Sequence, residues 1–207
     1  MKFRRHFSRA SLLLIAFTFA AVSTSAGFQQ QTPGSSREVG DQPPRSPAQN
    51  YFTDTPLVDQ DGRELRFYSD LLQGKVVVIN SFFSSCTDSC PAMAGTLARI
   101  QDWLADRIGK EARIISISVD PRNDTPPVLK QYAQRFKARP GWSFLTGKPQ
   151  DVELVLQKLG QHVDAREDHL NIFIIGNERT GLWKKAFGLA RPDDIIKVVD
   201  SVLSDKK

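Results

Sequence analysis

Two cysteines are the residues of this chain whose type and spacing most clearly point to chemistry. Cys86 and Cys90, the only cysteines, lie four positions apart in SSCTDSCPAM, between a predicted strand and a predicted helix. Residues i and i+4 share a helix face, so we expect both sulfur atoms to point to one spot. A helix N-terminus also favours the thiolate, which lowers the thiol pKa. We expect nucleophiles or metal ligands rather than a structural disulfide, because so short a loop would constrain the unfolded chain little.

Histidine is the residue type that could complete a metal site with two thiolates. Two histidines, His162 and His169, fall outside the N-terminal segment. His169 immediately precedes an apolar strand, and the residues alone leave it open between a metal ligand and a hydrogen-bonded loop histidine. His162 follows Gly160 and is predicted to lie on the surface. Two sulfurs and one imidazole suit Cu(I) through ligand softness, whereas zinc would need a fourth ligand or water.

The elements that position these residues can be predicted from hydrophobic patterns. Continuously apolar, β-branched runs over 75–83 and 113–119 predict strands buried on both faces of a sheet. A three- and four-residue apolar repeat predicts a helix over about 91–108 between them. Asp124-Thr125-Pro126 predicts the N-cap and the first-turn proline of a second helix, ending near 139–141. Further elements are expected as a hairpin about 59–62, a strand over 142–145, a helix over 151–159 ended by Gly160, strands over 170–175 and 182–187, and a helix over 192–203.

These elements predict the fold class. Strand, helix, strand and helix in succession, followed by an antiparallel hairpin and a closing helix, are typical of α/β proteins. We therefore expect a single α/β domain with a central mixed sheet, flanking helices and an N-terminal β-hairpin.

The first 26 residues have the three parts of a secretory signal. A basic start (MKFRRHFSR) precedes a 13-residue apolar run over 10–22, and small residues follow at 24–26. As a helix the run would cover roughly 20 Å, short of the roughly 30 Å of a bilayer core, which favours a cleaved signal peptide over an uncleaved membrane anchor. Adjacent Arg4 and Arg5 leave both general and twin-arginine export open. We expect a periplasmic protein, or one anchored in the inner membrane and facing the periplasm.

The charge balance and the composition of the remaining residues bear on partners and on domain boundaries. Four of the 28 basic residues lie within residues 1–26, so 24 basic residues remain against 23 acidic ones. That balance predicts no nucleic-acid partner. Residues 27–50 are rich in Gln, Ser, Gly and Pro and are predicted to form a disordered linker. The folded domain is expected over residues 51–207.

Several motifs, taken in chain order, resemble those of the SCO/SenC copper proteins of respiratory-oxidase assembly, over roughly residues 53–203. They are DQDG at 59–62, GK at 74–75, CTDSCP at 86–91, SVDPRNDTP at 118–126 and LTG at 145–147, and His169 falls where the family's ligand histidine lies. The chain departs from the family where Thr87 replaces a frequent proline and Ser84-Ser85 replace an aromatic-Thr pair. Loss of that proline loosens the loop and could shift the thiol redox potential, so metal binding and redox chemistry both stay open.

The resemblance implies a thioredoxin-like fold in which Cys86, Cys90 and His169 bind a copper ion. The ligand set favours Cu(I), and whether Cu(II) also binds stays open. It also implies a metallochaperone that delivers copper to, or prepares, the dinuclear copper site of cytochrome c oxidase. The recipient would be subunit II of that oxidase or another copper enzyme. The alternative is an enzyme, a periplasmic thiol-disulfide oxidoreductase acting on a copper-receiving partner, with Cys86 attacking and Cys90 resolving. A peroxiredoxin-type peroxidase is a third possibility.

The other conspicuous residues have structural interpretations. Asp88 lies between the thiols and is expected either to tune their charge or to be an exposed loop carboxylate. Asp120 and Asp124 are expected to serve in a turn and a helix cap rather than in a metal site. The tryptophans, predicted to pack in the core or at its rim, are Trp103, Trp142 and Trp183.

Overall fold

Two parallel strands form the middle of the fold in a computed structural model that describes residues 46–206. β3 (Val76–Phe82) and β4 (Ala112–Ser118) pair in parallel from Val76 opposite Ala112 to Phe82 opposite Ser118. Every residue of β3 is buried, and so is all of β4 except Arg113. This burial explains their continuous apolar composition, because both faces of the sheet are covered. The two predicted buried strands are confirmed.

A seven-stranded mixed sheet extends from this pair in the order β2-β1-β5-β4-β3-β6-β7. β5 (Trp142–Thr146) joins β4 in parallel, while β6 (Ile172–Asn177) and β7 (Leu182–Phe187) continue antiparallel from β3. On the other side β1 (Pro56–Asp59) pairs antiparallel with both β5 and β2 (Glu64–Arg66). The predicted N-terminal hairpin and mixed sheet are confirmed.

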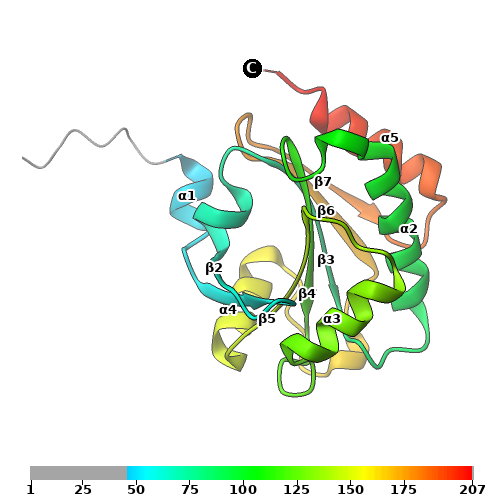
Figure 1. Cartoon of the computed structure of the whole chain (residues 1–207). Coiled ribbons are helices and arrows are strands. Elements are labelled where there is room, and N and C mark those ends of the chain that lie inside the picture. Colours follow the sequence, from blue (N-terminus) through cyan, green and yellow to red (C-terminus); the bar gives the residue numbers. More distant parts are fainter. Residues whose placement is uncertain (1–45, 207) are drawn as a thin grey trace, which may run out of the picture. The chain divides into compact units, whose positions relative to one another are not determined.

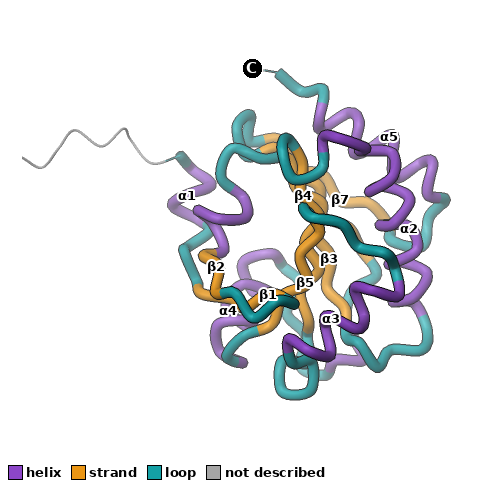
Figure 2. Tube along the Cα trace, viewed as in Figure 1, coloured by secondary structure: helices purple, strands orange, loops and turns teal. Residues whose placement is uncertain are grey.

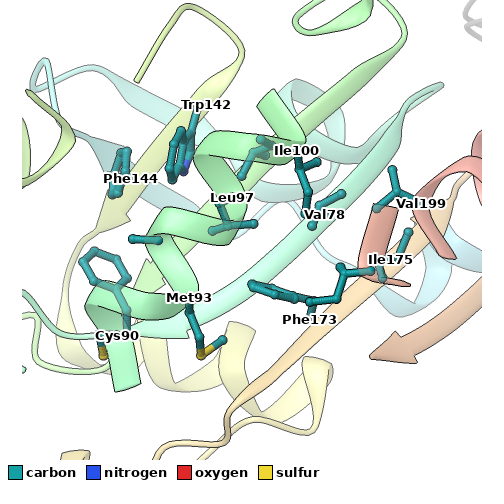
Figure 3. Packing of buried hydrophobic residues seen from close by; sticks show 14 of the residues in the cluster. Val78, Cys90, Met93, Leu97, Ile100, Trp142, Phe144, Phe173, Ile175 and Val199 are labelled. Atoms are coloured by element: carbon teal, nitrogen blue, oxygen red, sulfur yellow. The ribbon is translucent and has the colours of Figure 1, made fainter. Parts of the chain in front are cut away.

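Helices cover both faces of the sheet (Figures 1 and 2). One face packs against α2 (Ser89–Leu104), α3 (Pro126–Arg135) and α5 (Pro192–Leu203), and the other against α4 (Pro149–Leu159) and the helical turn Phe67–Leu72. Leu97 and Ile100 of α2 point toward the sheet between the aromatic rings of β5 and the side chains of β6 and α5 (Figure 3). Because α2 begins at Ser89, next to Cys90, this core fixes one side of the pocket described below.

Several boundaries differ from those predicted. α2 begins at Ser89 and ends at Leu104, after which Ala105–Arg107 forms a 3-10 turn. α3 ends at Arg135, four residues before the predicted end, and Lys137 follows with a positive φ of 50°. β6 begins at Ile172 rather than residue 170. α4 ends where predicted, with Gly160 in the left-handed conformation at φ 64°, a geometry that glycine adopts without a Cβ penalty.

The predicted linker overlaps a helix. α1 (Pro47–Tyr51) includes residues 47–50, because Ser46 caps it, accepting a hydrogen bond from Gln49 N at 3.1 Å. Ser46 Oγ also donates to Glu178 at 2.9 Å, which joins α1 to the body of the domain. The predicted signal and residues 27–45 of the linker lie outside the described residues. Within residues 46–206 no helix has the length and apolar character needed to cross a membrane.

Candidate metal centre

The cysteine loop connects the end of β3 to the start of α2. Cys86 lies in the loop, where its N–H donates to Phe83 O at 3.2 Å, and Cys90 is the second residue of α2. Cys86 is 9% exposed and Cys90 only 2%. The expectation that the thiols share a helix face is therefore wrong, because the helix begins three residues after Cys86. A turn of the loop brings the two sulfurs together.

His169 approaches the thiols from another segment. It follows the 3-10 turn Arg166–Asp168 and is 8% exposed. Its Nδ1 lies 3.1 Å from Arg166 O, and its Nε2 lies 3.2 Å from Cys90 Sγ. A carbonyl oxygen can only accept, so Nδ1 carries the proton and the Nε2 lone pair faces Cys90. The ring of Phe83 meets the imidazole edge to face, with centroids 5.4 Å apart.

The three side chains form one cluster of soft donors. The Cys86 and Cys90 sulfurs and a ring nitrogen of His169 lie within 4.8 Å of one another, the one such potential metal-binding group found in residues 46–206. Two ligands roughly 2.3 Å from a shared ion can be at most roughly 4.6 Å apart, so the cluster needs only small adjustments to hold one. Two thiolates and a neutral imidazole match Cu(I) by softness. This donor set fits copper.

A surface pocket of about 410 Å³ opens onto the cluster. Cys86 and His169 line it, together with Phe83 and Arg166, whereas Cys90 lies behind. An incoming ion or partner side chain therefore reaches Cys86 and His169 first. Cys86 is also the more accessible thiol for attack on a disulfide, as the redox alternative requires.

The acidity of Cys90 differs from the prediction. Burial raises the pKa of the Cys90 thiol to about 12, with a further contribution from its hydrogen bond with Cys86. The helix N-terminus was expected to lower this pKa, but desolvation of the charged form outweighs that effect at a side chain only 2% exposed. The apo site therefore holds Cys90 as a neutral thiol, which can donate to Nε2 of His169.

A buried carboxylate supports the cysteine loop from beneath. Asp124 is 1% exposed and accepts hydrogen bonds from Ser84 N at 3.1 Å, from Ser84 Oγ, and from Ser118 Oγ at 2.5 Å. The predicted helix-cap role of Asp124 is wrong, because Thr125 occupies the N-cap of α3 and Asp124 faces the strand ends instead. This carboxylate therefore connects Ser84, in the loop after β3, to Ser118 at the end of β4.

The remaining predicted residues lie as follows. Asp88 is exposed and lines the pocket. Asp120 shapes a turn, accepting from Asn123 Nδ2 at 2.9 Å, as expected, and additionally forms an unpredicted ion pair with Arg166. His162 is exposed on a different pocket. The three tryptophans pack in or against the core, as predicted: Trp103, Trp142 and Trp183.

The fold and the cluster together define a class, the thioredoxin-like domains that present two thiols and an imidazole in a surface pocket. Within this class the chain belongs to the SCO1/SenC family, whose model matches residues 43–203. It is 38% identical over 94 residues to the SCO1 protein homolog of Bacillus subtilis (strain 168), covering 44% of this chain and 47% of that protein. The chain spans about half the length of the curated relatives it matches.

Solved structures agree with this assignment. BsSco, described as a member of the Sco family of cytochrome c oxidase assembly proteins and as containing a disulfide switch, is 30% identical, with a TM-score of 0.61 over 75% of this chain and 95% of that one. Yeast Sco1 with copper bound is 27% identical, with a TM-score of 0.60 over 73% and 92%. The predicted family and thioredoxin-like fold are confirmed.

Proposed function

We propose that this protein is a copper metallochaperone that binds one Cu(I) through Cys86, Cys90 and His169. The observation that carries the proposal is the cluster itself, with three soft donor atoms within 4.8 Å at the base of a pocket. Membership of a family that includes a copper-bound yeast structure supports copper as the cargo.

Copper transfer by ligand exchange suits this geometry. The thiols belong to the β3–α2 loop, whereas His169 belongs to the separate segment before β6. An entering ligand from a partner could displace the imidazole while both sulfurs still hold the ion. The description of BsSco favours cytochrome c oxidase as the recipient system, with subunit II or another copper enzyme accepting the ion. We further propose that the protein works in the periplasm, either free there or attached to the inner membrane and facing the periplasm.

A second function is thiol-disulfide exchange. It is favoured by two free thiols near each other, of which Cys86 is the more exposed. Here the Cys86 thiolate attacks a partner disulfide and one partner sulfur leaves as a thiolate. Cys90 then loses its proton and attacks Cys86 Sγ of the mixed disulfide, and the second partner sulfur leaves as a thiolate that takes up this proton. The partner gains both electrons, and Cys86 and Cys90 form a disulfide. Copper binding requires His169, whereas this exchange does not.

Replacing His169 with alanine separates the two functions. Groups that merely hydrogen-bond a metal-ligating imidazole contribute roughly 10- to 100-fold to affinity, so loss of the ligand should weaken Cu(I) binding at least about tenfold. Titration with Cu(I) against a competing chelator measures this, and disulfide-reductase activity is measured on the same preparation. His162→Ala is the matched control, because His162 is exposed and away from the cluster.

The chaperone model requires the His169→Ala protein to lose affinity while His162→Ala retains it. Unchanged affinity in both variants, to within a few fold, would sink that model. Retained reductase activity in His169→Ala combined with weak wild-type copper binding would instead favour the oxidoreductase.

A further inference from the structure

Arg166 orients the His169 imidazole through its backbone carbonyl. That oxygen accepts two hydrogen bonds from His169, one from the ring Nδ1 at 3.1 Å and one from the backbone N–H at 3.3 Å. Together they fix the tautomer and aim Nε2 at Cys90. The direction of the ring therefore depends on where the backbone of Arg166 is held.

The side chain of Arg166 determines that position. Its guanidinium forms an ion pair with Asp120 beyond the end of β4, contacts Glu167 at 2.8 Å, and lies over the Phe83 ring at 5.2 Å from the centroid. In the described part of the chain, the bond to Asp120 is the only hydrogen bond that links residues 162–168 to another segment. The other polar contacts of this stretch are within itself, apart from one between His162 and Glu153 that is 4.0 Å long. The polar contacts that hold this segment to the rest of the domain therefore come mainly from Arg166.

Asp120, the partner of Arg166 in this ion pair, is itself held in place by hydrogen bonds. Its side chain is 11% exposed and accepts from Asn123 Nδ2 at 2.9 Å, and its backbone N–H donates to Ser118 Oγ at 3.0 Å. Ser118 also donates to Asp124, which holds the cysteine loop. One cluster of side chains at the end of β4 therefore supports both the histidine segment and the cysteine loop.

We propose that Arg166 is a positioning residue for the metal site, whose ion pair with Asp120 holds His169 over Cys86 and Cys90. This inference rests on the proposed copper-binding function. Loss of the ion pair frees residues 162–168, so the imidazole no longer stays aligned before the ion arrives. Part of the binding free energy must then be spent on ordering that segment, and affinity falls.

The test compares Arg166→Ala, Arg166→Lys and Arg99→Ala. Arg166→Ala should weaken Cu(I) binding about tenfold, the low end for groups that support a metal-bound imidazole. Arg166→Lys keeps the charge and should recover part of the loss. Arg99→Ala is the matched control, because Arg99 forms an ion pair of the same type with Asp193, at 2.9 Å, away from the site. It should bind copper as the wild type does.

A double-mutant cycle shows whether Arg166 acts through His169. In a His169→Ala background, adding Arg166→Ala should change copper affinity less than twofold, because the side chain that it positions is already gone. Amide hydrogen exchange of the metal-free protein gives an independent readout. Arg166→Ala should accelerate exchange at the His169 amide and leave α2 and the strands unchanged.

Each outcome bears on a different claim. A full tenfold loss in the His169→Ala background, or wild-type affinity and exchange in Arg166→Ala, overturns the positioning role while the copper site stands. Absence of Cu(I) binding by the wild-type protein overturns the proposed function instead, and the exchange result still reports on whether Arg166 holds the segment.

Discussion

Raising the pH from 6 to 9 should tighten Cu(I) binding by at least about a thousandfold, at least about tenfold per pH unit, because each ion displaces at least one thiol proton. Burial raises the pKa of Cys90 to about 12, so this thiol stays protonated in the metal-free protein throughout that range. In the copper complex it must be a thiolate. Since at least one proton, that of Cys90, is released on binding, a lower proton concentration favours the complex, and the affinity rises with pH.

The pH dependence of copper affinity also depends on the groups around Cys90. Cys86 and His169 are its neighbours in the metal-binding cluster, and Tyr132 of α3 lies in the same hydrophobic core. Burial raises the pKa of Tyr132 as well, so the hydroxyl adds no charge between pH 6 and 9. Titration against a chelator of known pH dependence measures the slope. An affinity independent of pH would mean that Cys90 is already ionised before copper arrives, and would contradict the burial argument.

Replacing Asp124 with alanine should lower the free energy of unfolding by about 3 kcal/mol, because each buried donor left without a partner costs about 1–3 kcal/mol. Three donors lose their acceptor: Ser84 N, Ser84 Oγ and Ser118 Oγ. The hydroxyls can partly rotate to other partners, so we expect less than the full sum. Ser84 lies two residues before Cys86, so the cysteine loop should also loosen and copper affinity should fall.

Urea unfolding of the metal-free protein measures the stability change. Asp102→Ala is the control, because the Asp102 carboxylate is 75% exposed and its ion pair with Arg139 lies on the surface. Exposed pairs contribute about 0–1 kcal/mol, so this variant should unfold nearly as the wild type does. Equal stabilities of the two variants would show that Asp124 does not support the loop.

Much of the fold could be predicted from the sequence because its signals are local. The apolar runs of β3 and β4, the helical repeat of α2 and the glycine that ends α4 each depend on neighbouring residues. Boundaries were predicted less well where tertiary contacts decide them. Ser46 bonds to Glu178, 132 positions away, so the extent of α1 could not be seen in local composition.

The sequence predicts the ligand residues of the site, but not the hydrogen bonds and the burial that surround them. Cys86 and Cys90 stood out by spacing, while His169 needed the family resemblance, because only folding brings it 3.2 Å from Cys90. The cap signal of Asp124 was misleading, since an aspartate before a helix serves equally well as a buried acceptor. The pKa of Cys90 was predicted in the wrong direction because a helix N-terminus is visible in sequence, whereas burial is not.

The central claim is that one Cu(I) is held by Cys86, Cys90 and His169, and X-ray absorption of the protein loaded with one equivalent of copper tests it most directly. The account predicts a first coordination shell of two sulfurs and one imidazole nitrogen, with the nitrogen lost in His169→Ala and kept in His162→Ala. A shell of sulfur alone in the wild-type protein, or a nitrogen that persists in His169→Ala, would contradict it.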